Sequence, residues 1–368
     1  MGMKKKLPED LPVPATASRP VVALAIGDAA GISAELAAKA LSDPQTRDAA
    51  HYVVIGDRRL LAQGEKIAGV GPTCDVWEPG TVLNAGARPI LIDLGNINPA
   101  TVTAGQASVA TGGAALENFR TILRLGAVGA VDAVAFTPFN KYAMKLALPS
   151  YVDEIEVITH ETGAKGNGRE FNILDKLWNA RVTSHVPLKD VAKYITKENV
   201  QAGIELTDRC MREAGIANPR IAVAGLNPHA GDGGNFGREE IDEIEPAVAA
   251  AKAKGIACDG PFPPDTVFLR ASRGDFDAVQ TMFHDQGQIA MKLMGFERGV
   301  TLIAGYGFPV CTPAHGTAYD IAGKGVANIG ATRQALLIAA ALAKPKGLDP
   351  AMRTQKVQSV VSSLRAAA

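Results

Sequence analysis

The chain has 368 residues, of which 47% are hydrophobic and 21% charged, and its formal net charge at pH 7 is zero. This composition is typical of a soluble globular protein, and the length indicates two domains. The balanced charge argues against a nucleic-acid-binding surface, and no apolar segment approaches the roughly 20 residues that cross a bilayer.

The cysteines and the N-terminal segment bear on where in the cell the protein is expected. The four cysteines have no CxxC spacing, which argues against a disulfide framework or a cysteine-bound zinc and favours a cytoplasmic location. Residues 1–19 contain basic residues and prolines but no apolar segment of the kind found in signal peptides. We therefore expect a disordered tail there.

Strand-like and helix-like segments alternate along the rest of the chain, which predicts an α/β fold with a mostly parallel sheet. Strands are expected at residues 21–26, 52–55, 89–94, 130–136, 171–174, 181–184, 220–224, 278–282 and 301–304. Helices are expected at residues 34–41, 107–125, 189–196, 207–214 and 239–254. Residues 138–170 are expected to be irregular, and residues 260–275 are rich in Pro and Gly; either segment could carry the chain between domains.

The first candidate site lies directly after the first strand. Gly27 and Asp28 open a short turn before a helix, where backbone amides and a carboxylate could meet a ligand. The alternative is an ordinary loop with Asp28 as a helix cap. Lys141 follows the strand at 130–136 and could bind an anion or exchange a proton. Its alternative is a lysine that only faces solvent.

Three histidines each follow an apolar, strand-like segment: His185, His229 and His284. In an open α/β sheet the carboxyl ends of the strands line the ligand crevice, so these imidazoles could meet around one metal ion. Asp285 could orient the imidazole beside it or bind the metal itself. Each histidine taken alone could instead be a turn or core residue.

The last candidate is the glycine-rich segment 315–328, which suits a loop around a planar ligand and its ribose. Asp320 could accept a hydrogen bond from a ribose 2′-hydroxyl and would repel a 2′-phosphate. A glycine-rich surface loop is the alternative. The expected cofactor contacts are Gly27, Asp28, His315, Gly316, Thr317, Ala318, Asp320, Ile321 and Asn328.

These segments together resemble the 4-hydroxythreonine-4-phosphate dehydrogenase family of vitamin B6 biosynthesis. The most specific matches are LNPHAGDGG with the later GREEID, GPFPPDT, FHDQG with Lys292, and HGTA with AGKG. The segment 315–328 also resembles the adenosine-binding loop of isopropylmalate dehydrogenase. The resemblance covers nearly all of the chain after the tail.

The resemblance implies a two-domain fold like that of isocitrate and isopropylmalate dehydrogenases, with a cleft between the domains. The expected cofactor-binding domain comprises residues 20–140 and 285–368, and the expected substrate, metal and dimerisation domain comprises residues 141–284. A homodimer with its active site at the interface is implied, with a divalent ion (Zn, Mn, Co, Ni or Mg) on His185, His229 and His284. The implied reaction is oxidation of a secondary alcohol of a hydroxy acid by NAD(P), commonly followed by decarboxylation of the β-keto acid.

The substrate contacts of the family carry over in part. The family histidine and lysine fall on His160 and Lys292, while Glu161, Thr301 and Val310 stand where the family has threonine, asparagine and arginine. Valine offers no bidentate contact to an anion. A carboxylated substrate without phosphate, such as a cis-dihydrodiol of the terephthalate type, is therefore the alternative substrate class.

The predicted cofactor is NAD rather than NADP, because Asp320 is followed by Ile321 and not by a basic pair. The predicted proton acceptor is Lys292 or Lys141. Two other classes remain open: a metal-dependent aldolase or hydrolase without redox chemistry, and a sugar-acid binding protein with structural histidines. Binding of NAD separates the dehydrogenase from both.

Overall fold

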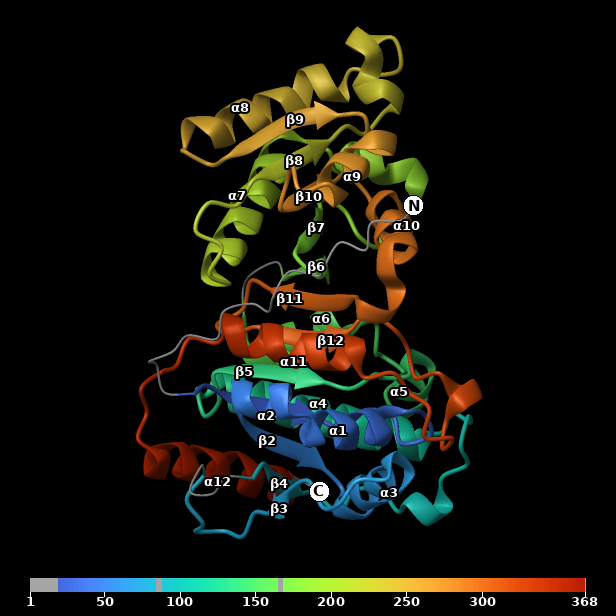
Figure 1. The fold of residues 1–368 in the computed structure, drawn as a ribbon, viewed down its shortest axis with the longest axis vertical. Helices are drawn as coiled ribbons and strands as arrows, with labels where there is room; N and C mark the ends of the chain where they lie inside the picture. Colours follow the sequence, from blue (N-terminus) through green and yellow to red (C-terminus); the bar gives the residue numbers. More distant parts are fainter. Residues whose placement is uncertain (1–18, 84–87, 165–167, 368) are drawn as a thin grey trace, which may run out of the picture.

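A computed structural model describes residues 19–83, 88–164 and 168–367. The predicted α/β fold is confirmed, because one 12-stranded, mostly parallel sheet runs along the long axis with helices packed around it (Figure 1). The strand order is β3-β4-β2-β1-β5-β12-β11-β6-β7-β10-β8-β9. The expected tail lies outside the described residues except for Arg19, whose guanidinium donates to the carbonyl of Ala50 at 3.2 Å.

Six strands form a parallel block at one end of the sheet. They are β1 (Val21–Ala25), β2 (His51–Gly56), β3 (Asp75–Val76), β4 (Ile90–Asp93), β5 (Ala133–Phe136) and β12 (Val310–Pro313). The residues of β1 and β5 are all buried, as expected for strands covered on both faces. Their side chains alternate between two core clusters, since Val22 and Leu24 belong to one and Val21 and Ala23 to the other.

Four strands form a second parallel block at the other end, and two antiparallel strands join the blocks. The second block contains β7 (Leu177–Arg181), β8 (Ile221–Ala224), β9 (Cys258–Phe262) and β10 (Ala278–Thr281), and the joining strands are β6 (Arg169–Leu174) and β11 (Val300–Ala304). Because β11 is antiparallel to both β12 and β6, and β6 is antiparallel to β7, the two blocks run in opposite directions along the sheet. Strands whose carboxyl ends lie at the same edge of the sheet, and can line one ligand crevice, therefore belong to the same block.

Helices cover both faces of the first block. The helix α4 (Val109–Ala127) packs against β1, β2 and β5, and α12 (Pro350–Ala367) packs on α4. The opposite core cluster contains residues of α1 (Ser33–Ser42) and α11 (Gly330–Leu342). The remaining helices include α2 (Pro44–Ala49), α3 (Arg58–Ala68), α5 (Lys141–Ala147), α6 (Glu154–Thr162), α7 (Lys197–Glu213), α8 (Glu245–Ala253), α9 (Pro264–Ser272) and α10 (His284–Gly295). Within the described residues, no helix has both the length and the apolar composition needed to cross a bilayer.

The structure corrects several boundaries. The segment 138–170 was expected to be irregular, yet it contains α5 and α6. The segment 260–275, which is rich in Pro and Gly, contains part of β9 and α9. The strand expected at 181–184 is β7 and ends at Arg181, because a turn at Asp175, with φ 53°, pairs Leu174 with Leu177 and fixes the register. The proposed domain boundaries stay a prediction, since the sheet continues from β12 through β11 and β6 into the second block.

Candidate functional site

The segments after β1, β5 and β12 converge at one edge of the first block. The backbone N–H of Gly27 donates to the hydroxyl of Thr137 at 2.9 Å, and that of Asp28 donates to the carbonyl of Pro138 at 3.0 Å. A Cβ on Gly27 would lie 2.3 Å from the carbonyl oxygens of Thr137 and Pro138, so only glycine permits this approach. The segment after β12 joins the other two, because the carbonyl of its Thr317 accepts the N–H of Ile32 at 3.1 Å.

Asp28 is the buried acid of this edge, with an exposed fraction of 1%. Its carboxylate accepts hydrogen bonds from the N–H of Ala30 at 2.9 Å and from the hydroxyl of Tyr319. Burial raises the pKa of Asp28 above its ordinary value, and the hydrogen bonds from Tyr319 and Ala30 offset this only in part. A buried carboxyl with a raised pKa beside a glycine-rich loop is a common mark of a functional position.

The segment 315–328 is held against α1 by hydrogen bonds to a partly buried ion pair of that helix. Lys39 Nζ lies 2.7 Å from Glu35 and donates to the carbonyls of Gly325 and Ala327, and the N–H of Ala327 donates back to Glu35 at 2.8 Å. A backbone held in this way presents its amides and carbonyls in fixed positions. Ile321, expected to contact the cofactor, is partly buried against a small apolar cluster beside α1.

Other residues of this segment are open to solvent. Asp320, Asn328 and Gly316 are exposed, whereas Thr317 is buried and its carbonyl faces α1. Their contacts to a cofactor stay a prediction. The exposed carboxylate of Asp320 is compatible with the predicted ribose contact.

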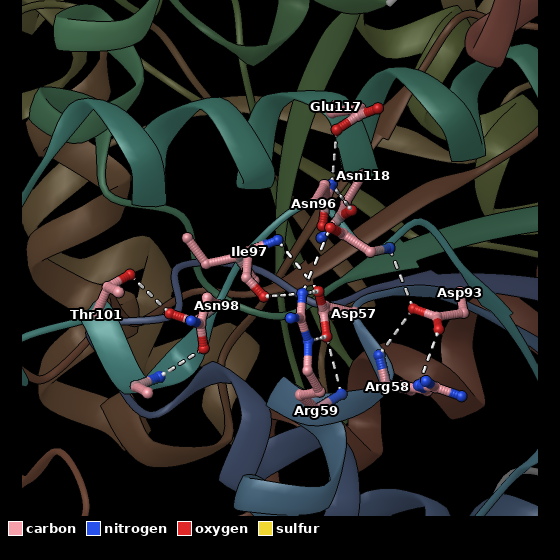
Figure 2. A network of polar contacts seen from close by, with 12 residues as sticks. Asp57, Arg58, Arg59, Asp93, Asn96, Ile97, Asn98, Thr101, Glu117 and Asn118 are labelled. Carbon is pink, nitrogen blue, oxygen red and sulfur yellow. Dashed lines mark hydrogen bonds and ion pairs between the residues drawn. The ribbon is translucent and has the colours of Figure 1, made fainter.

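A polar network not predicted from sequence ties together the carboxyl ends of β1, β2 and β4 (Figure 2). Asp57 is fully buried, pairs with Arg59 at 2.6 Å and accepts the N–H of Ile97 at 3.1 Å. Asn118 accepts from Asn96 at 3.0 Å and donates to the carbonyl of Ile26 at 2.8 Å. Burial tends to raise the pKa of Asp57, but the hydrogen bonds from Arg59 outweigh it and lower that pKa. The network fixes the loops that border Asp28.

The three candidate metal ligands follow three adjacent parallel strands of the second block. His185 follows β7, His284 begins α10 after β10, and His229 follows β8, and the sheet order places β10 between the other two. The ring centroids of His185 and His284 are 6.0 Å apart. His229 instead lies 5.9 Å from the ring of Phe236. No group of three His, Cys, Asp or Glu side chains in the described part of the chain is arranged to hold a metal ion.

The three histidines therefore form only part of a metal site: His185 and His284 are close together, and His229 is apart. Two imidazoles lie near one another, and Asp285 Oδ1 is 2.7 Å from Nδ1 of His284, which is the orienting contact expected of this carboxylate. Asp285 is 73% exposed. His229 stands on the neighbouring strand end, and its loop would have to bring it toward the other two. A three-histidine site stays a prediction.

The loop of His229 has an unusual backbone. Residues 229–233 all have positive φ, including 54° at His229 and 45° at Asp232, a conformation that non-glycine residues seldom adopt. The buried carboxylate of Glu240 holds this loop, because it accepts the N–H groups of Leu226 and Asn227, each at 2.7 Å. Sequence reasoning noted the GREEID segment but missed this role for Glu240.

Two residues at the start of α6 contact segments that follow strands of both blocks. Lys141, after β5, lies 3.1 Å from Glu154, and His185, after β7, lies 3.8 Å from Asp153. Since these carboxylates belong to consecutive residues, the predicted base and a predicted metal ligand approach the same helix terminus. Lys141 is 58% exposed. The carboxyl ends of strands from opposite blocks thus face a common region although the blocks run in opposite directions.

The residues expected to contact the substrate differ in how exposed their side chains are. His160 is 80% exposed at the end of α6, while the carboxylate of Glu161 is 5% exposed and pairs with Arg124 at 2.7 Å and Arg120 at 3.2 Å. Val310 is 0% exposed in the core of the sheet, and its place in the substrate site stays a prediction.

Thr301 and Lys292 stay predictions. Thr301 lies on β11, where its hydroxyl accepts from Asn172 at 3.4 Å. Lys292 lies on α10 and is exposed.

The chain is similar to known proteins over most of its length. The family described as pyridoxal phosphate biosynthetic protein PdxA matches residues 48–339. A relative from Rhizobium meliloti (strain 1021), provisionally named 4-hydroxythreonine-4-phosphate dehydrogenase 2, is 57% identical over 329 residues, which are 89% of this chain and 94% of the relative.

Two solved structures are similar throughout. A 4-hydroxythreonine-4-phosphate dehydrogenase from Burkholderia phymatum is 36% identical with a TM-score of 0.74, over 89% of this chain and 99% of the other. A terephthalate 1,2-cis-dihydrodiol dehydrogenase from Burkholderia xenovorans LB400 is 27% identical with a TM-score of 0.62, over 87% of this chain and 98% of the other.

Proposed function

The chain belongs to the PdxA family of pyridoxal phosphate biosynthetic proteins, and from that premise we propose a metal-dependent, NAD-linked dehydrogenase that oxidises a secondary alcohol of a hydroxy acid. The observation that carries the proposal is the approach of Lys141 and His185 to consecutive carboxylates of α6, with His284 beside His185. The named relatives of the chain are dehydrogenases, which supports an oxidoreductase.

The roles of the residues follow from chemistry. Lys292 or Lys141 accepts the hydroxyl proton as the carbon gives up its hydride to the cofactor. Where the ketone formed is a β-keto acid, cleavage of its C–CO₂ bond releases CO₂ and leaves an enolate, whose α-carbon a protonated lysine reprotonates. His185, His229 and His284 would hold a divalent ion, which would supply Lewis-acid polarisation of the alcohol oxygen, and a bound nicotinamide would supply the hydride acceptor. The segment 315–328 and the edge around Asp28 position the dinucleotide. A homodimer with the site at its interface is part of the proposal.

The substrate has two candidate classes. Phosphorylated hydroxy acids, such as 4-phosphohydroxythreonine, are supported by the names of the relatives. A cis-dihydrodiol carboxylate without phosphate is favoured by Val310, because an alkyl side chain buried in the sheet gives no guanidinium for a phosphate.

Steady-state assays separate these classes. The purified protein is assayed on 4-phosphohydroxythreonine, phosphorylated sugar acids and terephthalate dihydrodiol, each with NAD or NADP and with several divalent ions. We expect turnover with NAD, and the acid with the highest kcat/KM identifies the class. A preference for NADP would contradict the role of Asp320. If the protein neither quenches NADH fluorescence nor shifts its melting temperature with NAD, the dehydrogenase proposal fails.

Metal content tests the histidines separately. Elemental analysis of dialysed protein should find one divalent ion per chain, which His185→Asn and His284→Asn should each reduce. His315→Asn serves as the matched control, because His315 lies in the segment assigned to the cofactor. Equal metal content in all four proteins would remove these histidines from the site.

A further inference from the structure

Two adjoining cavities lie at the amino ends of β1, β2 and β4, the edge opposite to Asp28 and Asp57. They measure about 20 Å³ and about 180 Å³ and share Arg47, Arg88 and Pro89 in their walls. The smaller cavity is also lined by Arg19, His51, Tyr52, Ala50 and Ile90, and the larger by Leu41, Ser42, Gly71, Pro72 and Thr73. Among the described residues that line these cavities, none is an aspartate or a glutamate.

The arginines of these walls are only partly neutralised. The side chain of Arg47 has no hydrogen bond or ion pair to any residue that the structure describes. Arg88 lies 3.3 Å from Asp75, but the two side chains are 47% and 60% exposed, so water screens that pair. Another nearby carboxylate, Asp43, is occupied by Arg333 at 2.7 Å and by the N–H of Thr46 at 3.1 Å.

Tyr52 supplies a second, independent observation. It is 2% exposed, and its hydroxyl is buried without a hydrogen-bond partner among the described residues. A buried hydroxyl left unpartnered is unfavourable, and a ligand or ordered water at the cavity would satisfy it. Burial and the positive charges of Arg19 and Arg353 lower the pKa of His51, which is consistent with a positive potential at this edge.

We propose that these cavities bind a small organic phosphate, with Arg47, Arg88 and the Tyr52 hydroxyl as hydrogen-bond donors. Guanidinium groups match the geometry of phosphate oxygens and bind them with charge-assisted hydrogen bonds. The larger cavity is several times the liquid volume of a water molecule, about 30 Å³. Its apolar wall of Leu41, Pro72 and Pro89 suits the organic part of the ligand. The site is separate from the proposed catalytic region at the carboxyl ends of the strands.

Calorimetric titration with inorganic phosphate tests the proposal, with acetate at equal ionic strength as the monoanion control. Arg47→Gln removes no hydrogen bond or ion pair between side chains of the described residues and is the primary variant; Arg88→Gln is the second. We expect each to weaken phosphate binding about tenfold or more, as for loss of a charge-assisted hydrogen bond. Arg209→Gln, an exposed arginine on α7, should bind as the wild type does. A phosphate site in the catalytic region would be unaffected by any of these changes.

Tyr52→Phe should change the melting temperature in opposite ways without and with phosphate, relative to the wild type. Without phosphate it should melt at the same or a higher temperature than the wild type, because it removes an unpartnered buried hydroxyl. With phosphate, its melting temperature should rise less. If Arg47→Gln combined with Arg88→Gln is folded by its melting curve and binds phosphate as tightly as the wild type, the proposal is overturned. Tighter binding of glycerol 3-phosphate than of inorganic phosphate would support the organic part of the ligand.

Discussion

At the scale of single residues, Asp28 is a buried carboxyl at the proposed cofactor edge, and its burial opposes the stability of the folded protein at neutral pH. Its carboxyl is buried beside the loop 315–328 and its pKa is raised chiefly by burial. The sequence identified Asp28 from its place after a strand. It did not identify Tyr319 as the hydrogen-bond partner, because the two residues are 291 positions apart in the chain.

Asp28→Asn should therefore stabilise the protein at neutral pH. The raised pKa means that the folded state binds the proton more tightly than the unfolded state, so stability contributed by Asp28 is present below pH 3.8 and is lost as pH rises through the folded pKa. Asparagine Oδ1 still accepts from the N–H of Ala30, and its Nδ2 can donate to the hydroxyl of Tyr319, without that loss. We expect a gain of about 0.5–2 kcal/mol at pH 7, in the range of stabilising substitutions.

Urea unfolding from pH 3.5 to pH 8 measures this effect. The advantage of Asp28→Asn should shrink toward zero at the acidic end, whereas the exposed Asp48→Asn should show no such trend. An advantage of constant size across the range would mean that the carboxyl is not the cause. Cofactor binding by the same variant should weaken if Asp28 contacts the dinucleotide.

At the scale of elements, the loop of His229 and the helix α6 organise the proposed site. The loop is a run of positive φ angles that Glu240 holds from the following helical segment. The sequence indicated a loop from its glycines, asparagine and aspartates. The buried carboxylate was not apparent, because a glutamate in an acidic segment such as GREEID usually faces solvent.

Glu240→Ala should lower the free energy of unfolding by about 2–3 kcal/mol, because it leaves the half-buried N–H groups of Leu226 and Asn227 without their acceptor. Chemical unfolding measures the loss, and metal content measures the proposed consequence for His229. The neighbouring Glu239→Ala removes only the contact with Asn227 Nδ2 and is the matched control. Equal unfolding energies for both variants would show that Glu240 does not hold the loop.

At the scale of the whole molecule, the C-terminal helix is joined to the sheet by a buried ion pair. Arg353 of α12 binds Asp132 at 3.0 Å through both carboxylate oxygens, with side chains 6% and 0% exposed. Asp132 also accepts the N–H of Val21 at 2.9 Å and that of Lys346 at 3.1 Å. One carboxylate therefore connects the first strand, the start of β5 and the last helix.

Arg353→Met should destabilise the protein by about 3–5 kcal/mol, because it leaves the carboxylate of Asp132 buried without its counter-charge. The double variant Asp132→Asn with Arg353→Met should lose less than the single one, since no buried charge then remains. Unfolding in urea measures both. A double variant less stable than the single one would show that the backbone contacts of Asp132 matter more than its charge.

The sequence alone determined the α/β class, the alternation of strands and helices, and the segments that lie at strand ends, because hydrophobic periodicity and glycine-rich turns are local properties. It also carried the family resemblance. Tertiary structure alone decided that Val310 is buried in the sheet, that the two strand blocks run in opposite directions, and that α6 brings Lys141 and His185 to one place. These depend on strand order and register, which are fixed by contacts between residues far apart in the chain.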